Sequence, residues 1–124
     1  MLNNQKFLFQ SVSNDLSLIR KNAPLVHNIT NYVAMPTIAN ILLALGASPL
    51  MAHAPEELRD LSKLTQALVL NLGTIDDIWL YAMRQAQCFA KKNKKPIILD
   101  PVGAGASEYR TKLCYYYLKM EYQS

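Results

Sequence analysis

Apolar residues recur along this chain in two patterns, which predict helices and strands in alternation. Over residues 3–21, Phe7, Leu8, Val12, Leu16 and Ile19 recur at spacings of three and four, which is typical of an amphipathic helix. Short continuous apolar runs instead predict strands that are buried in a parallel sheet. These predicted strands cover residues 24–29, 48–52, 67–72 and 97–99. Further helices are predicted over residues 33–45, 55–64 and 74–92.

The order of these elements predicts an α/β fold, with at least four parallel strands in a three-layer αβα arrangement and right-handed crossovers. Pro36 and Pro55 each lie in a predicted first helical turn, where a missing N–H is tolerated, and Gly46 is a natural helix end. Thr74 is expected to start the helix over residues 74–92. The residues expected on the buried side of the helix over 33–45 are Ile38, Ile41, Leu42 and Leu45.

The stretch over residues 96–107 combines a buried strand with a glycine-rich loop. Asp100 ends the apolar run, and Pro101 stops the strand there, so a carboxylate lies at the carboxyl end of a strand expected to be buried on both faces. Gly103 and Gly105 allow a sharp turn, and Ser107 can cap a following helix. The stretch has neither the dinucleotide-binding nor the Walker pattern. It is either a ligand-binding loop or a capped turn.

Polar residues also follow the other predicted strands. Thr30 and Asn31 follow the first strand, Met51 and His53 end the second, and Asn71 to Thr74 end the third. Because the carboxyl ends of parallel strands meet at one edge of a sheet, these groups are expected to gather near Asp100. That arrangement predicts a ligand site at this edge.

Composition narrows the possible classes of protein. The chain has 124 residues and a formal net charge of +4, which suits one domain. A lysine cluster over residues 91–95 is expected to be a solvated helix end, and nucleic-acid binding is disfavoured because arginine and aromatic residues are not interleaved with it. Cys88 and Cys114 have no metal-binding spacing, so we expect reduced thiols and a cytoplasmic protein. We expect no membrane segment.

Several motifs resemble, in order, the N-terminal half of the hydroxyethylthiazole kinases of the ribokinase-like superfamily. The resemblance covers about residues 22–111. Its motifs are His27-Asn28-Ile29-Thr30-Asn31, Ala39-Asn40, Leu42 to Pro49, Met51, Pro55-Glu56-Glu57, Leu70 to Thr74 and Leu99 to Ala106. The resemblance implies a ribokinase-like fold and phosphorylation of 4-methyl-5-(2-hydroxyethyl)thiazole by ATP with Mg²⁺, a salvage step towards thiamine. It also implies a homotrimer with sites between subunits.

The resemblance also implies roles for particular residues. Met51 and Asn31 would line the thiazole pocket, and Asn71, Gly73 and Thr74 would lie beside it. Asp100 would lie near the phosphates and bind Mg²⁺, which prefers oxygen ligands.

Each of these roles has a structural alternative. Met51 could fill a gap in the core, Asn31 could cap a helix, and Asn71 could satisfy loop backbone. Asp100 could be structural, and His27 is better explained as a hydrogen-bonded histidine near a strand.

The chain departs from the resemblance at its C-terminal side. The family's Arg-Gly-Asn segment and its later Gly-Thr-Gly-Cys-type loop have no match, so we expect no catalytic residue and no complete ATP site. We therefore predict a single incomplete domain over residues 1–124, truncated, frame-shifted or a fragment, with an atypical tail over residues 112–124. Alone it would be marginally stable and unable to phosphorylate. The alternative functions are a non-catalytic thiazole-binding module and a subunit-interaction module.

Overall fold

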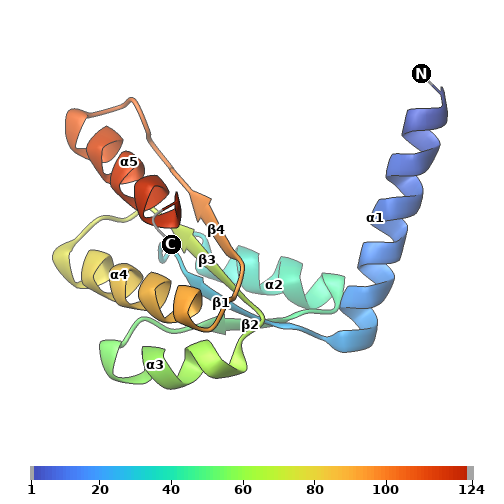
Figure 1. Cartoon of the computed structure of the whole chain (residues 1–124), viewed down its shortest axis with the longest axis horizontal. Helices are drawn as coiled ribbons and strands as arrows, with labels where there is room; N and C mark the ends of the chain where they lie inside the picture. The colour runs from blue at the N-terminus through green and yellow to red at the C-terminus, as the bar shows by residue number, and fades with distance from the viewer. Residues whose placement is uncertain (1, 123–124) are drawn as a thin grey trace.

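The computed structural model describes residues 2–122, and it describes side chains for residues 8–120. Helices and strands alternate along the chain (Figure 1). In order, they are α1 (Leu2–Asn22), β1 (Leu25–Ile29), α2 (Met35–Leu45), β2 (Ser48–Met51), α3 (Pro55–Leu64), β3 (Ala67–Asn71), α4 (Asp77–Lys92), β4 (Ile97–Asp100) and α5 (Glu108–Tyr122).

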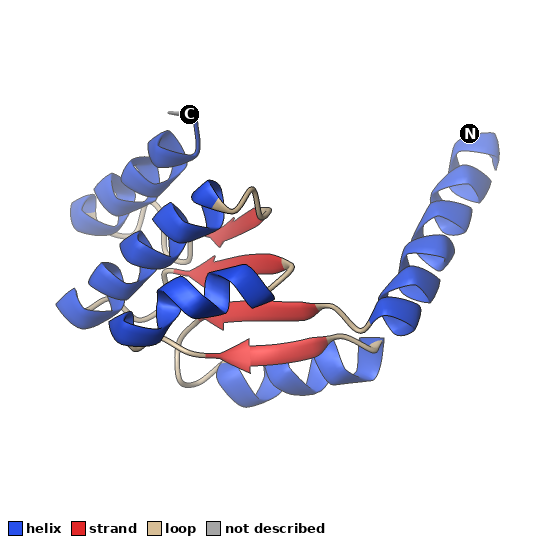
Figure 2. Cartoon of the chain, turned by 60° about the horizontal axis from the view of Figure 1, so that its bottom comes forward, coloured by secondary structure: helices blue, strands red, loops and turns tan. Residues whose placement is uncertain are grey.

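The four strands form one parallel sheet in the order β2-β1-β3-β4. Helices lie on both faces of this sheet (Figure 2), so the predicted α/β fold is confirmed. Over residues 2–122, none of the helices combines the length and apolar character that crossing a bilayer requires.

The hydrophobic core lies between one face of the sheet and the helices α3, α4 and α5. Leu68 and Leu70 of β3 point into it, as do Leu58 of α3 and Met83 of α4. Tyr117 of α5 is buried against α4, and its hydroxyl donates a hydrogen bond of 3.0 Å to the Leu80 carbonyl. Residues 112–122 of the tail, which was expected to be atypical, therefore belong to a packed helix.

The opposite face of the sheet is covered less completely. Helix α2 packs there against β2, and α1 extends away from the sheet (Figure 1). Both helices were predicted correctly, and Ile38, Leu42 and Leu45 of α2 are partly buried, but the burial predicted for Ile41 was wrong. Ile41 of α2 is 53% exposed, and Val12 of α1 is also exposed; the side chain of Phe7 lies outside the described range. Apolar periodicity identifies the face that can be buried, and packing against another element decides whether it is.

The same correction applies to β4. This strand was expected to be buried on both faces, but Ile98 is 58% exposed, whereas Ile97 and Leu99 on the core side are partly buried. The reason is positional, because β4 is an edge strand of the described sheet and α2 lies at the other edge. Ile98 therefore has no helix over it among the described elements.

Hydrogen-bond direction distinguishes the two edges of the sheet. In a parallel ladder the N–H and C=O of one residue point to the same side, and this side alternates along the strand. Ser48 N–H donates to Pro24 C=O, so Ser48 and Leu50 face β1 and Pro49 faces the outer edge, where it offers no N–H. At the other edge, Pro96 and Asp100 C=O accept from β3. The N–H and C=O groups of Ile97 and Leu99 consequently face outward.

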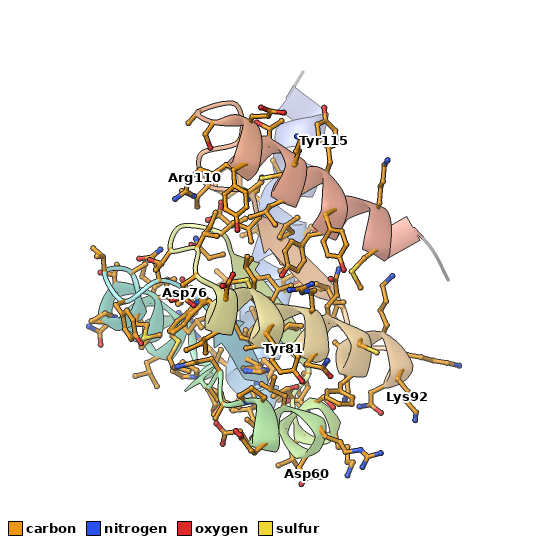
Figure 3. All side chains as sticks on the ribbon, turned by 90° about the vertical axis from the view of Figure 1, so that its left-hand side faces the viewer. Asp60, Asp76, Tyr81, Lys92, Arg110 and Tyr115 are labelled. Carbon is orange, nitrogen blue, oxygen red and sulfur yellow. The ribbon has the colours of Figure 1, made fainter. Side chains whose placement is uncertain are left out.

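The start of α4 differs from the prediction. The helix begins at Asp77, and Asp76 caps it by accepting a hydrogen bond of 2.7 Å from Trp79 N–H. Thr74 lies instead in the loop before the helix. At α5 the predicted cap is confirmed, since Ser107 Oγ accepts from Arg110 N–H at 3.1 Å. Figure 3 shows Asp76 and Arg110 at the same end of this helix layer, away from Lys92.

A candidate ligand site at the carboxyl edge of the sheet

Three polar side chains form a hydrogen-bonded line across the carboxyl ends of β1, β3 and β4. Asn31 Nδ2 donates to Asn71 Oδ1 at 3.0 Å, and Asn71 Nδ2 donates to Asp100 Oδ2 at 2.7 Å. The strand register explains this meeting, because Asn71 and Asp100 are direct partners in the β3–β4 ladder. The predicted gathering of these strand ends at one edge is therefore observed.

Backbone groups fix the orientation of both amides. Ala34 N–H donates to Asn31 Oδ1 at 2.9 Å, and Gly73 N–H donates to Asn71 Oδ1 at 2.9 Å. An N–H needs an acceptor, so the oxygen of each amide is identified and the nitrogen must face the other way. Asn71 therefore presents a donor to the Asp100 carboxylate. Its oxygen accepts two hydrogen bonds, so Asn71 holds other residues in place more than it offers atoms to a ligand.

Position 73 has no room for a side chain, so it requires glycine. A Cβ at this position would lie 2.7 Å from both Asn31 Nδ2 and Asn71 Oδ1, so any larger residue would push the two amides apart. Thr74 follows in the same loop and is half-buried. Both residues therefore lie beside the polar line, in the loop between β3 and α4.

Met51 lies on the same face of the sheet as Asn71 but two strands away. Its register partner is Asn28 of β1, which in turn pairs with Val69 of β3, two residues before Asn71. The Met51 side chain is half-buried. Among the predicted site residues, the structure joins Asn31, Asn71, Gly73 and Asp100 directly, and Met51 contributes an apolar surface farther along the same face.

Arg110 is a site residue that the sequence analysis did not single out. Its Nη1 donates to the carbonyls of Leu72 at 2.7 Å and Val102 at 3.1 Å, and its Nη2 donates to the Gly73 carbonyl at 3.1 Å. The guanidinium thus ties the loop after β3 to the loop after β4. Gly103 has a φ of +75°, and a Cβ there would lie 2.9 Å from Arg110 Cδ. This glycine was recognised as a turn residue, but its neighbour across the loop was not.

His27 has a structural environment, as the favoured alternative predicted. The ring is buried, and its Nε2 lies 2.7 Å from the Ala52 carbonyl, which requires the proton on Nε2. Burial lowers the pKa of His27, while the hydrogen bond to Ala52 and the charge of Glu57 act in the opposite direction. A neutral, hydrogen-bonded histidine next to β2 therefore supports the strand that carries Met51.

The side chains at Asp100 can offer magnesium one protein carboxylate. The carboxylate is exposed, and Asn71 holds one of its oxygens, which leaves the group accessible to a cation. Within the described part of the chain, no group of three or more His, Cys, Asp and Glu residues lies close enough to hold a metal ion. Magnesium at nucleotide sites commonly uses one or two carboxylates together with waters and phosphate oxygens. Asp100 can serve as one such ligand.

A parallel sheet covered by helices, with polar groups assembled at the carboxyl ends of its strands, defines an α/β protein of the class that binds small ligands at this edge. The sequence pattern of the hydroxyethylthiazole kinase family matches residues 16–124. The chain therefore belongs to the hydroxyethylthiazole kinase family.

Individual relatives agree with this assignment. A hydroxyethylthiazole kinase from Pyrococcus furiosus is 52% identical over 110 residues, which are 89% of this chain and 42% of the relative. One from Pyrococcus abyssi is 58% identical over 98 residues, 79% of this chain and 37% of the relative. The solved structure of a hydroxyethylthiazole kinase protein from Pyrococcus horikoshii OT3 matches with a TM-score of 0.82 and 52% identity, covering 85% of this chain and 41% of that chain. The chain thus spans about two fifths of the length of the relatives it matches.

Proposed function

We propose that this chain carries the thiazole-binding part of a hydroxyethylthiazole kinase site. In the complete enzyme, the site would transfer a phosphoryl group from ATP to the hydroxyl of 4-methyl-5-(2-hydroxyethyl)thiazole, as in thiamine salvage. The names of the relatives support the reaction class. The observation that carries the proposal is the hydrogen-bonded line from Asn31 through Asn71 to Asp100 at the carboxyl edge.

The proposed roles follow from where each residue lies along this edge. Met51 offers a polarisable thioether against which a flat heteroaromatic ring can pack. Asn31 and the loop of Gly73 and Thr74 lie between Met51 and the charged end of the line, so they can border the ring and its hydroxyethyl arm. Asp100 would bind Mg²⁺ at the phosphate end. Phosphoryl transfer depends mainly on positioning and charge neutralisation, which these groups can supply in part.

We assign no catalytic residue within the chain. Arg110 donates three hydrogen bonds to backbone carbonyls, and His27 is buried against Ala52, so neither side chain is placed to activate a hydroxyl. We therefore expect this chain alone to bind the thiazole without phosphorylating it. The homotrimer implied by the resemblance belongs to the same proposal and can be tested by sedimentation of the purified chain.

Calorimetric titration tests the proposal. The purified chain would be titrated with hydroxyethylthiazole and, separately, with Mg²⁺–ATP. Saturable thiazole binding that Met51→Ala weakens would support it. Leu64→Ala provides a matched control, since this exposed residue of α3 lies outside the site. Absence of thiazole binding by a folded sample would overturn the proposal.

Kinase activity of the chain alone would contradict the absence of a catalytic residue. The second candidate function, a subunit-interaction module, is favoured by the exposed apolar residues of α1 and α2, which leave surface for another protein.

A further inference from the structure

Three aromatic residues from three different connections meet at the carboxyl edge of the sheet. Trp79 lies in the first turn of α4 and is 2% exposed. The centroid of its ring system lies 4.9 Å from that of Tyr32, in the loop after β1, and 4.0 Å from that of His53, in the loop after β2. Helices α3 and α4 begin at the same end of the molecule (Figure 1). We call these three residues the aromatic cluster.

Trp79 is the fixed member of the aromatic cluster. Its side chain belongs to the hydrophobic core, and its backbone N–H donates the 2.7 Å hydrogen bond to Asp76 that caps α4. Tyr32 is 62% exposed and His53 is half-buried, so neither ring is enclosed by the core. Their planes are tilted from that of Trp79 by 58° and 33°, and aromatic pairs favour tilted or offset arrangements. The two loops therefore rest on Trp79.

Hydrogen bonding does not explain why tryptophan occupies this position. Trp79 Nε1 is buried and has no hydrogen-bond partner among the described residues. Burying such a donor without a partner costs free energy, and a smaller apolar side chain would avoid that cost. What the indole adds is a large aromatic surface that reaches both Tyr32 and His53.

Both loops in contact with Trp79 carry residues of the proposed thiazole pocket. Tyr32 directly follows Asn31, and His53 comes two residues after Met51. The ladder between β1 and β2 ends at Met51, so beyond this point the ladder no longer joins the two loops. Trp79 is in contact with both of them there. A shift of either ring would therefore change the separation of the two pocket residues.

We propose that Trp79 is a positioning residue for the thiazole pocket. Through the rings of Tyr32 and His53, it holds Asn31 and Met51 at the separation at which both border the same heteroaromatic ring. Loops that are held in place before the ligand arrives cost less to order on binding. Trp79 itself need not touch the ligand, because the two loops transmit its position. This role rests on the proposed function, because it concerns the same pocket.

Two protons report on the two loops in the free chain, without any ligand. The Ala34 N–H donates to Asn31 Oδ1 at 2.9 Å and reports on the loop after β1. The Nε2 proton of His27 is donated to the Ala52 carbonyl at 2.7 Å and reports on the loop after β2. The exchange of both protons with solvent can be followed by NMR, and it becomes faster when the loop that holds the proton opens more often.

A pair of core variants separates positioning from stability. Trp79→Leu removes both ring contacts, whereas Met83→Ala removes a fully buried side chain of the same helix outside the aromatic cluster. Compared at equal global stability, the Ala34 and His27 protons should exchange about tenfold faster in Trp79→Leu. Equal exchange in the two variants would overturn the proposal.

Titration with hydroxyethylthiazole measures the consequence for the pocket. Affinity should fall about tenfold in Trp79→Leu and stay within about threefold of the parent in Trp79→Phe, which keeps an aromatic ring at this position. Met83→Ala should bind like the parent, and equal losses in Trp79→Leu and Met83→Ala would overturn the proposal. If the folded parent binds no thiazole, the proposed function fails, and the exchange of the two reporter protons still decides whether Trp79 positions the loops.

A pair of surface variants covers the case in which Trp79→Leu does not fold. Tyr32→Ala removes one ring contact from the outside, since Tyr32 is 62% exposed. Tyr81→Ala alters a tyrosine that is 50% exposed on α4 and lies outside the aromatic cluster. We expect faster exchange at Ala34 in Tyr32→Ala only, with the His27 proton unchanged because the loop after β2 keeps its own contact. Faster exchange at Ala34 in neither variant, or in both, would overturn the proposal.

Discussion

Replacing Asn71 with aspartate turns the donor in the middle of the polar line into an acceptor. The parent Nδ2 donates to Asp100 Oδ2 at 2.7 Å, whereas the variant would bring two carboxylate oxygens to that separation. The other two hydrogen bonds, from Asn31 Nδ2 and Gly73 N–H, can still be accepted by an aspartate oxygen. The substitution therefore isolates one contact.

The size of the effect follows from Coulomb's law and from the lost hydrogen bond. Two unit charges at this separation repel by roughly 1.5 kcal/mol in water and roughly 6 kcal/mol at an effective dielectric constant near 20. Asp100 is exposed while Asn71 is 7% exposed, so the repulsion between the two carboxylates should be about 2 kcal/mol, close to the value in water. The lost hydrogen bond adds about 1 kcal/mol, which gives a loss of about 3 kcal/mol near pH 7.5.

The loss should shrink in acid. One of the two facing carboxyls takes up a proton in the folded variant more readily than in the unfolded chain, because a shared proton restores the hydrogen bond. A folded state that binds the extra proton gains stability as the pH falls, so Asn71→Asp should recover most of the repulsive part at pH 4.5. The nearly isosteric Asn71→Leu lacks this group, and its deficit relative to the parent should stay constant.

Urea unfolding of the three proteins at pH 7.5 and pH 4.5 measures both effects. With a denaturant slope of about 1.5 kcal/mol per molar for a chain of this size, the midpoint of Asn71→Asp should fall by about 2 M at pH 7.5. If Asn71→Asp is as stable as the parent at pH 7.5, or if its deficit follows that of Asn71→Leu across the pH range, the hydrogen-bonded line is wrong.

Three further predictions concern other contacts. Because burial lowers the pKa of His27 below 6.5, the folded parent binds fewer protons at this residue than the unfolded chain does, so its stability should fall as the pH drops through 6.5. Urea unfolding at several pH values should show a shallower fall in stability for His27→Gln. Equal dependence of stability on pH in the two proteins would contradict this prediction. Gly103→Ala and Gly105→Ala each place alanine at a residue of positive φ, which costs about 1–2 kcal/mol. Only the alanine at position 103 would also contact Arg110, so the thermal midpoint of Gly103→Ala should drop further. Equal drops would refute the clash with Arg110. Tyr117→Phe should cost about 1 kcal/mol in chemical unfolding. Burial raises the pKa of the parent tyrosine to about 12, which ultraviolet absorbance of the parent and the variant can measure by difference; an ordinary tyrosine pKa would place Tyr117 outside the core.

The elements could be predicted from the sequence because their signals are local. Proline in a first turn, a glycine end and short apolar runs depend on neighbouring residues, and they gave bounds close to those of α2, α3 and β3. The end of β4 at Asp100 was likewise fixed by Pro101. The error at the start of α4 arose because Thr74 and Asp76 are both good caps, and only the path of the loop decides between them.

For residues that are distant in sequence, the predicted strand order indicated which residues share an edge of the sheet, but it did not indicate which atoms are in contact. Parallel strands with polar ends implied that Asn71 and Asp100 share an edge, but the atoms that meet depend on register. Arg110 was missed because its partners Leu72 and Gly73 lie 38 and 37 residues away in sequence, and no local pattern marks a side chain that binds backbone carbonyls. Exposure of Ile98 was missed because an apolar residue indicates a preference for burial and cannot supply the element that would bury it.

The proline at the outer edge of β2 has a consequence for synthesis on the ribosome. Strand order β2-β1-β3-β4 means that, once β1 and β2 have emerged and paired, every later strand joins on the same side. Pro49 removes an N–H from the other side before β3 is made. The outer flank of β2 in a nascent chain therefore offers one backbone donor fewer than a strand without proline would, whereas the other flank is the one that its own next strand will occupy. Neighbouring nascent chains on a polysome have correspondingly fewer ways to join edge to edge.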